Sequence, residues 1–246
     1  QGRKGPNATS RKGSRLKSTR CFFTPTDKSP FFDEGIVTFE FSPNTVPGSH
    51  EKNSLSLVAQ IQEARPGARV LEISTASNHL LGVQLSALNL KLRSAWGLNS
   101  VERTYQASKV FERGGPFLEL LTDSRSAKGF PGIKSSGRLK GFQGPDGNFF
   151  PADGRSTFYD RLYIQALIQN PELLTSLLPF EIFTDVRFAK SKLGFHLSQP
   201  MNTQARSCAI AIGLFNSGGI SRLEQFVDGT PMLTQPMVEI EPLFDL

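Results

Sequence analysis

Residues 100–111, SVERTYQASKVF, combine helix-forming residue types with an unusual distribution of polar groups. At about 100° per residue, a helix over residues 100–112 places an acid, a phenol, an amide and an amine within an arc of about 100°. These side chains are Glu102, Tyr105, Gln106 and Lys109. A surface helix normally has a broad polar face and a narrower apolar stripe. Here the proportions are reversed, so we expect a buried helix, with Ser100 as its N-cap, whose polar stripe faces a cavity.

The acid and the base of this stripe suit covalent chemistry. Glu102 and Lys109 lie two helical turns apart, about 10 Å along the axis, so they converge on a group between them more readily than they pair directly. A lysine at the wall of a low-dielectric pocket has a perturbed pKa and becomes a usable nucleophile. The alternative is a partly exposed helix whose Glu, Gln and Lys side chains are solvated, with Tyr105 at the edge of the core. Spacing alone leaves both interpretations open.

The first hundred residues predict a small strand–helix–strand unit. Alternating apolar residues predict a strand within residues 35–43, and helical spacing predicts a helix within residues 51–65. An apolar run predicts a second strand within residues 69–75. Two prolines interrupt residues 21–35, which we expect to be an irregular lead-in. Residues 78–99 are ambiguous between buried strands and a loop with short helices.

From residue 100 onward the pattern is mainly helical. Helices are predicted at about residues 100–112, 116–125, 157–177 and 202–215. Residues 128–154 carry seven glycines and three prolines. Long connections of this kind tend to line sites or to move as lids. The predicted fold class is α+β, mainly α, with a single domain over residues 21–246.

The net positive charge of the chain is concentrated at its N-terminal end. The chain has 28 Lys and Arg against 22 Asp and Glu, and seven of these cations lie in residues 1–20, which contain no acid. Such a segment has too little apolar surface to fold alone, so we predict a flexible basic arm over residues 1–20. Its function is either to contact phosphates or to act as a solubilising tail.

Several classes of function lack the residues that they need. No apolar run approaches the roughly 18 residues of a membrane span, so we expect no membrane partner. Cys21 and Cys208 are expected to be free thiols in a reducing, cytoplasmic compartment. His50, His79 and His196 show no metal-ligand spacing. The chain also has no phosphate-binding loop or dinucleotide fingerprint, so we expect neither a metal nor another cofactor.

The helix of residues 100–111 also carries a family resemblance. Its pattern, Ser-Val-Glu-x-x-Tyr-Gln-Ala-x-Lys-x-Phe, resembles the signature helix of the NADAR family, also called YbiA-like. Downstream features follow in a similar order up to about residue 215: a Ser/Gly/Arg loop, a long helix, the acidic step FTDVRF and a polar-capped helix. The N-terminal segments resemble the branch that accompanies DarT-type toxins as antitoxins. The implied fold is a YbiA-like helical domain with a small N-terminal strand–helix–strand extension.

One region departs from the family pattern. A Trp-Gly pair and a Gly-Lys-Asn run, which compact members carry before their last helix, are absent here. The sequence RFAKSKLGFHLSQPMNTQAR stands in their place. Binding residues of this region are therefore not carried over from the family.

The resemblance implies hydrolysis of an N-glycosidic bond to ADP-ribose. In the toxin-associated branch, the substrate is ADP-ribosylated guanine in DNA, met as a single strand or as a flipped base. Lys109 is then the amine that attacks the anomeric carbon and forms a Schiff base, with Glu102 as its proton-transfer partner or orienting group. Tyr105 and Gln106 would bind or stack against the substrate. A DarT-type toxin is the functional partner.

The diphosphate and the ribose need partners of their own. Ser136 and Arg138, in the glycine-rich segment, offer backbone amides and a bidentate guanidinium. The start of the last predicted helix favours anions and adds three candidates. They are Asn202, Gln204 and Arg206. Asp185 matches the acidic step of the family and is a candidate ribose contact. Each of these residues has a capping, ion-pairing or surface role as its alternative.

Two other functions fit the same residues. One is an N-glycosidase of a small nucleotide or ribosylamine metabolite, which keeps the chemistry and changes the substrate. The other is a non-catalytic module that binds ADP-ribose or nucleic acid.

Overall fold

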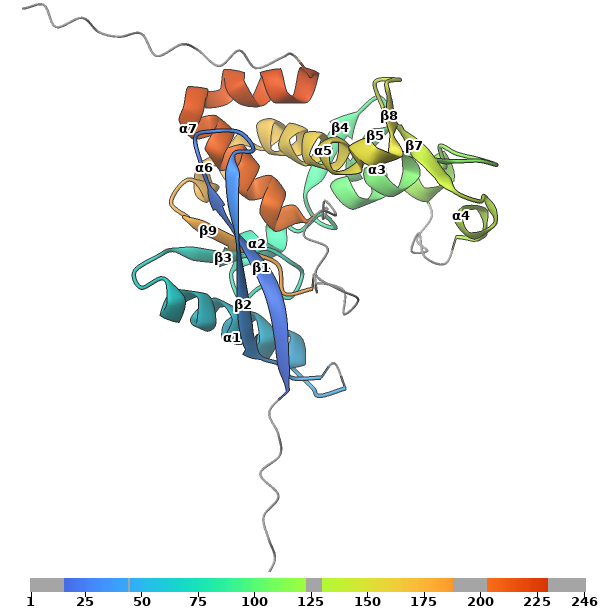
Figure 1. The fold of residues 1–246 in the computed structure, drawn as a ribbon. Coiled ribbons are helices and arrows are strands. Elements are labelled where there is room, and N and C mark those ends of the chain that lie inside the picture. Colours follow the sequence, from blue (N-terminus) through green and yellow to red (C-terminus); the bar gives the residue numbers. More distant parts are fainter. Residues whose placement is uncertain (1–15, 44, 123–129, 188–202, 230–246) are drawn as a thin grey trace, which may run out of the picture.

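A four-stranded sheet forms one side of the molecule. The computed structural model describes residues 16–43, 45–122, 130–187 and 203–229. The sheet consists of β1 (Lys17–Pro25), β2 (Phe32–Glu40), β3 (Val70–Glu72) and β9 (Ile182–Thr184), in the order β2-β1-β9-β3 (Figure 1). β1 is antiparallel to both of its neighbours, whereas β3 and β9 run parallel. The last strand of the chain therefore lies between the first and the third.

Helices cover both faces of this sheet. α1 (Ser49–Ala64) packs on one face, and α7 (Gln204–Asp228) packs on the other, beside α5 (Arg155–Gln169). Phe22 packs with the buried side chains of α1, whereas Cys21 and Phe23, its neighbours on β1, belong to the larger core that includes α5 and α7. Successive strand residues point to opposite faces, so β1 is buried on both sides.

Two predictions about the N-terminal segment are wrong. Residues 21–35 are not an irregular lead-in but the end of β1, a turn and the start of β2. A central strand is apolar on both faces and so lacks the period-two pattern. The basic arm cannot extend to residue 20, because Arg20 lies in β1, is buried, and donates from Nε to the carbonyl of Val186 at 2.7 Å. Residues 1–15 of the predicted arm lie outside the described residues.

Residues 91–122 and 130–154, called the small lobe below, gather on the other side of α5 from the four-stranded sheet (Figure 1). Its elements are β4 (Lys91–Ser94), β5 (Gly97–Ser100), α3 (Val101–Ala107), β6 (Lys109–Phe111), η1 (Leu118–Leu121), α4 (Pro131–Ser135), β7 (Leu139–Gln143), β8 (Phe149–Pro151) and η3 (Ala152–Gly154). β4 and β5 form a hairpin, and β6, β7 and β8 form a three-stranded antiparallel sheet. α2 (Leu80–Gln84) precedes this lobe, and α6 (Pro171–Leu177) follows α5.

The glycine-rich segment is more ordered than predicted. The expected long loop over residues 128–154 is wrong for its described part, which contains α4, β7 and β8. Phe142 of β7 is fully buried, and a Cβ on Gly141 would collide with the carbonyl of Phe150 on β8. Glycine therefore serves close strand packing here. The described part of the helix predicted at 116–125, up to residue 122, contains only the short 3-10 helix η1.

Two later helices differ from their predicted extents. The single helix predicted at 157–177 is split, because α5 ends at Gln169 and α6 begins with Pro171, which has no amide to continue a helix. The helix predicted at 202–215 extends to the end of α7 through a kink. At this kink Gly219 has φ 68°, in the left-handed region that glycine adopts without strain.

The predicted α+β class is confirmed, with more residues in helices than in strands. The strand–helix–strand prediction is confirmed by β2, α1 and β3. These elements do not stand apart, because β9 joins them in one sheet. Neither Cys21 nor Cys208 forms a disulfide, as predicted, and both side chains are buried. No helix within the described ranges is both long and apolar enough to span a membrane.

The central position of β1 predicts a sharp limit for N-terminal truncation. A chain that begins at residue 21 loses the strand pairs of residues 17–20 and the buried bond of Arg20 to Val186. We expect its free energy of unfolding, measured by urea denaturation, to be lower by several kcal/mol, about 1 kcal/mol for each hydrogen bond lost. A chain that begins at residue 16 is the matched control. Equal stability of the two chains would contradict the assignment of β1 to the core.

Candidate active site

Helix α3 is shorter than predicted, and this changes where Lys109 lies. Ser100 caps the helix as predicted, since its hydroxyl accepts a hydrogen bond from the amide of Arg103 at 3.3 Å. At the other end, the carbonyl of Ser108 accepts from the amide of Gln143 on β7 at 2.8 Å. This tertiary partner replaces the next helical turn. The chain therefore leaves the helix and enters β6 at Lys109.

The polar groups of the predicted stripe nevertheless meet. Gln106 donates from Nε2 to Oε1 of Glu102 at 2.7 Å, and its Oε1 accepts from Nζ of Lys109 at 2.6 Å. Glu102 and Lys109 are thus joined through a group between them and not by a direct ion pair, as their spacing predicts. The amide fixes the position of the amine relative to the carboxylate.

Tyr105 forms the floor beneath the amine. Its side chain is buried and stacks on Phe142, with ring centroids 5.1 Å apart. Nζ of Lys109 lies 5.3 Å from the centroid of the Tyr105 ring. Lys109 and Phe142 are paired across β6 and β7, so their side chains share one side of that sheet. The amine is therefore held between an aromatic ring and the Gln106 amide.

This environment favours the neutral form of the amine. Burial lowers the pKa of Lys109 from the ordinary lysine value, and the positive charge of Arg155 at the start of α5 lowers the pKa further. The charge of Glu102 opposes these two effects and raises the pKa. A larger neutral fraction at a given pH makes a lysine a better nucleophile.

Tyr159 connects this cluster to a second group of polar residues. Its ring lies edge-on to Tyr105, with centroids 5.2 Å apart. Burial raises the pKa of the Tyr159 phenol well above its ordinary value, and the charges of Glu102, Asp185 and Asp160 raise it further. The phenol therefore stays protonated, with carboxylates from three different segments close enough to act on it.

A buried ion pair joins α5 to α7 in the second group. Nη2 of Arg206 donates to Asp160 at 2.7 Å, and the Ser207 hydroxyl donates to the same carboxylate at 2.6 Å. Burial raises the pKa of Asp160 to about 6, although Arg206 and Ser207 act in the opposite direction. Arg206, a predicted substrate residue, thus has a protein partner for one end of its guanidinium.

Asp185 and Gln204 meet at the end of β9. Asp185 accepts hydrogen bonds from the amide of Arg187 at 2.9 Å and from Nε2 of Gln204 at 3.0 Å. Burial is the main cause that raises the pKa of Asp185 to about 7, and the nearby charge of Glu72 is the second. Gln204 also donates to the carbonyl of Ile73 at 2.6 Å, so both of its donors have protein partners. The structure gives Gln204 a bridging position between elements.

Ser136 and Arg138, two further predicted residues, have partners other than Lys109. The Ser136 hydroxyl donates to the carbonyl of Gly132 within the turn of α4. The Arg138 side chain is 82% exposed, and its Nε lies 3.4 Å from Glu112. Neither side chain is hydrogen-bonded to Lys109. Asn202 lies outside the described residues.

The first turns of α5 hold functional residues that the sequence did not single out. Arg155, Ser156, Tyr159 and Asp160 all contribute to the two groups, but the predicted helix begins at residue 157. A usable signal was the spacing of Ser156, Tyr159 and Asp160, which places them on one helical face. Their partners on α3 and α7 could not be read from that spacing.

Other chemistries find little support in the described part of the chain. No group of three or more His, Cys, Asp or Glu residues there is arranged to hold a metal ion. Burial raises the pKa of Cys208 to about 12, so its thiol is not a nucleophile. A cavity of about 140 Å³ lies by β1 and α1, lined by Arg20, Phe41, His50, Asn53, Val186 and Arg187. It holds neither a lysine nor a free carboxylate.

Comparison with known protein families gives a match over most of the chain. The family described as DarT1-associated NADAR antitoxin matches residues 18–232. This range covers the four-stranded sheet except its first residue, the small lobe and all of α7. No curated protein matches the chain significantly.

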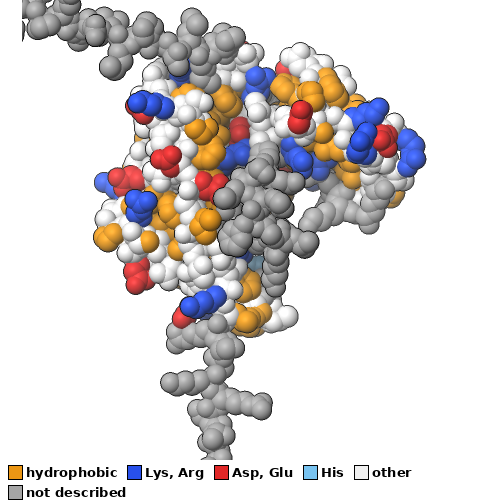
Figure 2. Space-filling model, viewed as in Figure 1, with side chains coloured by type: hydrophobic (Ala, Val, Ile, Leu, Met, Phe, Trp, Pro, Cys, Tyr) orange, Lys and Arg blue, Asp and Glu red, His pale blue; other side chains and the backbone are white. Residues whose placement is uncertain are grey.

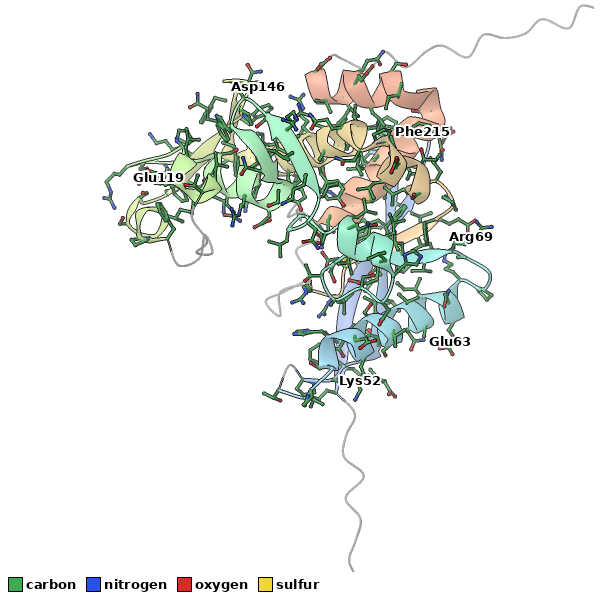
Figure 3. All side chains as sticks on the ribbon, turned by 180° about the vertical axis from the view of Figure 1, so that it is seen from behind. Lys52, Glu63, Arg69, Glu119, Asp146 and Phe215 are labelled. Carbon is green, nitrogen blue, oxygen red and sulfur yellow. The ribbon has the colours of Figure 1, made fainter. Side chains whose placement is uncertain are left out.

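The environment of Lys109 predicts early reactivity with acylating reagents. Acetic anhydride modifies only the neutral amine, so labelling at a series of pH values, read by mass spectrometry, reports when each lysine deprotonates. We expect Lys109 to become reactive at a lower pH than Lys52, an exposed residue of α1 far from this cluster (Figure 3). Arg155→Gln removes a neighbouring cation and should raise the pH at which Lys109 reacts, with Lys52 unchanged. Identical profiles for the two lysines would contradict the proposed environment.

Proposed function

The chain belongs to the DarT1-associated NADAR antitoxin family, and on this basis we propose that it is an N-glycosidase that removes ADP-ribose from modified guanine in DNA. Removal of the modification would reverse the action of a DarT-type toxin, which is the functional partner that the family description implies. The observation that supports this function best is the Glu102–Gln106–Lys109 chain over the Tyr105 ring. It holds an amine whose pKa is lowered and a carboxylate on either side of one amide group.

The first step uses Lys109 as nucleophile. Its neutral Nζ attacks the anomeric carbon of the ribose, the bond from that carbon to the guanine nitrogen breaks, and guanine leaves with the bonding electron pair and a proton. Lys109 gives up a proton and is joined to the ribose as a glycosylamine. Covalent catalysis of this kind divides one difficult displacement into two easier steps. Gln106 keeps the amine oriented during the attack, because its carbonyl oxygen accepts from Nζ.

The second step releases the sugar. Protonation of the ring oxygen opens the ribose and leaves a protonated Schiff base on Lys109. Water then adds to the imine carbon, and the amine departs with a proton, which returns the enzyme and yields ADP-ribose. Glu102 is the proton carrier within reach, since only Gln106 separates it from Lys109. Proton transfer by a positioned carboxylate contributes about 10²–10⁴-fold to such steps.

The distribution of charge supports a nucleic-acid substrate. The small lobe holds eight Lys and Arg against five Asp and Glu, whereas the described residues as a whole hold 19 Lys and Arg against 18 Asp and Glu. Figure 2 shows Lys and Arg side chains gathered on this lobe. Cationic surface attracts the phosphate backbone without regard to sequence. The basic part of the folded chain is therefore the part that carries Lys109, which favours modified DNA over a small neutral metabolite.

Substitution at the two reacting positions tests this proposal. Lys109→Arg keeps the positive charge but removes the nucleophilic amine, and we expect it to lower kcat/KM on an ADP-ribosylated guanine oligonucleotide by at least about 10³-fold. Glu102→Gln should lower it by about 10²–10⁴-fold. Release of ADP-ribose is followed by chromatography, and Lys52→Arg, at an exposed site, is the matched control.

The outcomes separate the candidate functions. Wild-type rates for Lys109→Arg would exclude the lysine mechanism. Hydrolysis of a small ADP-ribosylated nucleoside with an equal kcat/KM, and no decrease in the rate on DNA as salt is raised, would favour the metabolite enzyme. Tight binding of ADP-ribose without any turnover would favour the binding module.

A further inference from the structure

Helices α5 and α7 bring their N-terminal ends together. Residues later in α7 contact residues later in α5. Arg206 and Ser207 bind Asp160, and Sγ of Cys208, the next residue of α7, lies 3.3 Å from the hydroxyl of Tyr163, one turn further along α5. The two helices therefore run side by side in the same direction. Their positive dipole ends act on the same region.

Two buried donors at this shared end have no partner among the described residues. They are the hydroxyl of Ser156, in the first turn of α5, and Nε of Arg206, in the first turn of α7. The side chains are close to each other, because Nη2 of Arg206 also lies 3.5 Å from the carbonyl of Ser156. The exposed fractions are only 9% for Ser156 and 6% for Arg206. Buried donors of this kind are normally hydrogen-bonded, so both point to a polar ligand.

The remaining groups at this end favour an anion. Residue 154 at the N-cap of α5 is a glycine, and no side chain caps the first turn of this helix. Arg155, the first residue of α5, is exposed and adds a cation. The negative charge of Asp160 is matched by Arg206. The positive end of a helix, a guanidinium edge and a second arginine are features that bind phosphate groups.

The position of this end relative to Lys109 fits one part of ADP-ribose. Tyr159 lies on the same turn of α5 as Ser156 and Asp160 and touches Tyr105, the floor beneath Lys109. We propose that the shared N-terminal end of α5 and α7, with Ser156 and Arg206 as its buried donors, is the subsite that holds the diphosphate of ADP-ribose. This inference rests on the proposed function, because it takes the reacting ribose to lie at Lys109.

Binding measurements test the subsite without turnover. Titration calorimetry on the full chain uses inorganic pyrophosphate, ADP-ribose and adenosine as probes. Ser156→Ala removes a hydroxyl that has no protein partner, so folding is preserved, and we expect pyrophosphate and ADP-ribose to bind about tenfold more weakly, the loss of one hydrogen bond to a charged group. Arg206→Lys keeps a cation for Asp160 but removes Nε, and we expect it to weaken the binding of pyrophosphate and ADP-ribose by a similar factor. Thr157→Ala, at the exposed neighbouring position, is the matched control and should change nothing.

The results distinguish this subsite from the proposed reaction. Competition between pyrophosphate and ADP-ribose, weakened by both variants and with adenosine affinity unchanged, supports the subsite even if no ADP-ribose is released from DNA. Unchanged binding of pyrophosphate and ADP-ribose in Ser156→Ala and Arg206→Lys overturns it, even if Lys109-dependent hydrolysis is observed. Failure of pyrophosphate to compete with ADP-ribose also overturns it.

Discussion

The site depends on the partial burial of one lysine amine against an aromatic ring. An ammonium group loses hydration when it is buried, and only part of that cost is returned by the 2.6 Å hydrogen bond to Gln106 and by the face of the Tyr105 ring. The uncompensated part lowers the pKa of Lys109. The arrangement exists because α3 stops at Ala107 and β6 begins at Lys109, which folds the amine back over the helix that precedes it.

The surrounding core is also arranged at an electrostatic cost. Asp160 and Asp185 are fully buried carboxyls whose pKa values are raised to about 6 and about 7. A carboxyl whose pKa is higher in the folded state stabilises that state at low pH, and this contribution is lost as the pH rises through the raised value. Near neutral pH the two groups therefore reduce stability, which is common where polar groups are retained for function. Both act on Tyr159, which links them to the amine.

The sequence predicted local chemistry better than it predicted long-range pairing. The proximity of Glu102, Gln106 and Lys109 followed from their short separation in the sequence, although Lys109 lies in β6 and not in the predicted helix. The α+β class followed from the periodicity. The extent of α3 could not be predicted from local spacing. The partner that ends this helix, the amide of Gln143, lies 35 residues after Ser108. β1 was missed because a strand buried on both faces shows no alternation. The roles of Ser156 and Asp160 depend on α7, about 46 residues further along, which no local pattern reveals.

Trapping the covalent intermediate tests the central claim most directly. The protein is mixed with an ADP-ribosylated guanine oligonucleotide and sodium borohydride, which reduces a Schiff base to a stable amine, and the modified residue is located by peptide mass spectrometry. The mechanism predicts an adduct of the mass of reduced ADP-ribose on Lys109 and none in the Lys109→Arg variant. An adduct on a different lysine, or release of ADP-ribose without any trapped adduct, would contradict it.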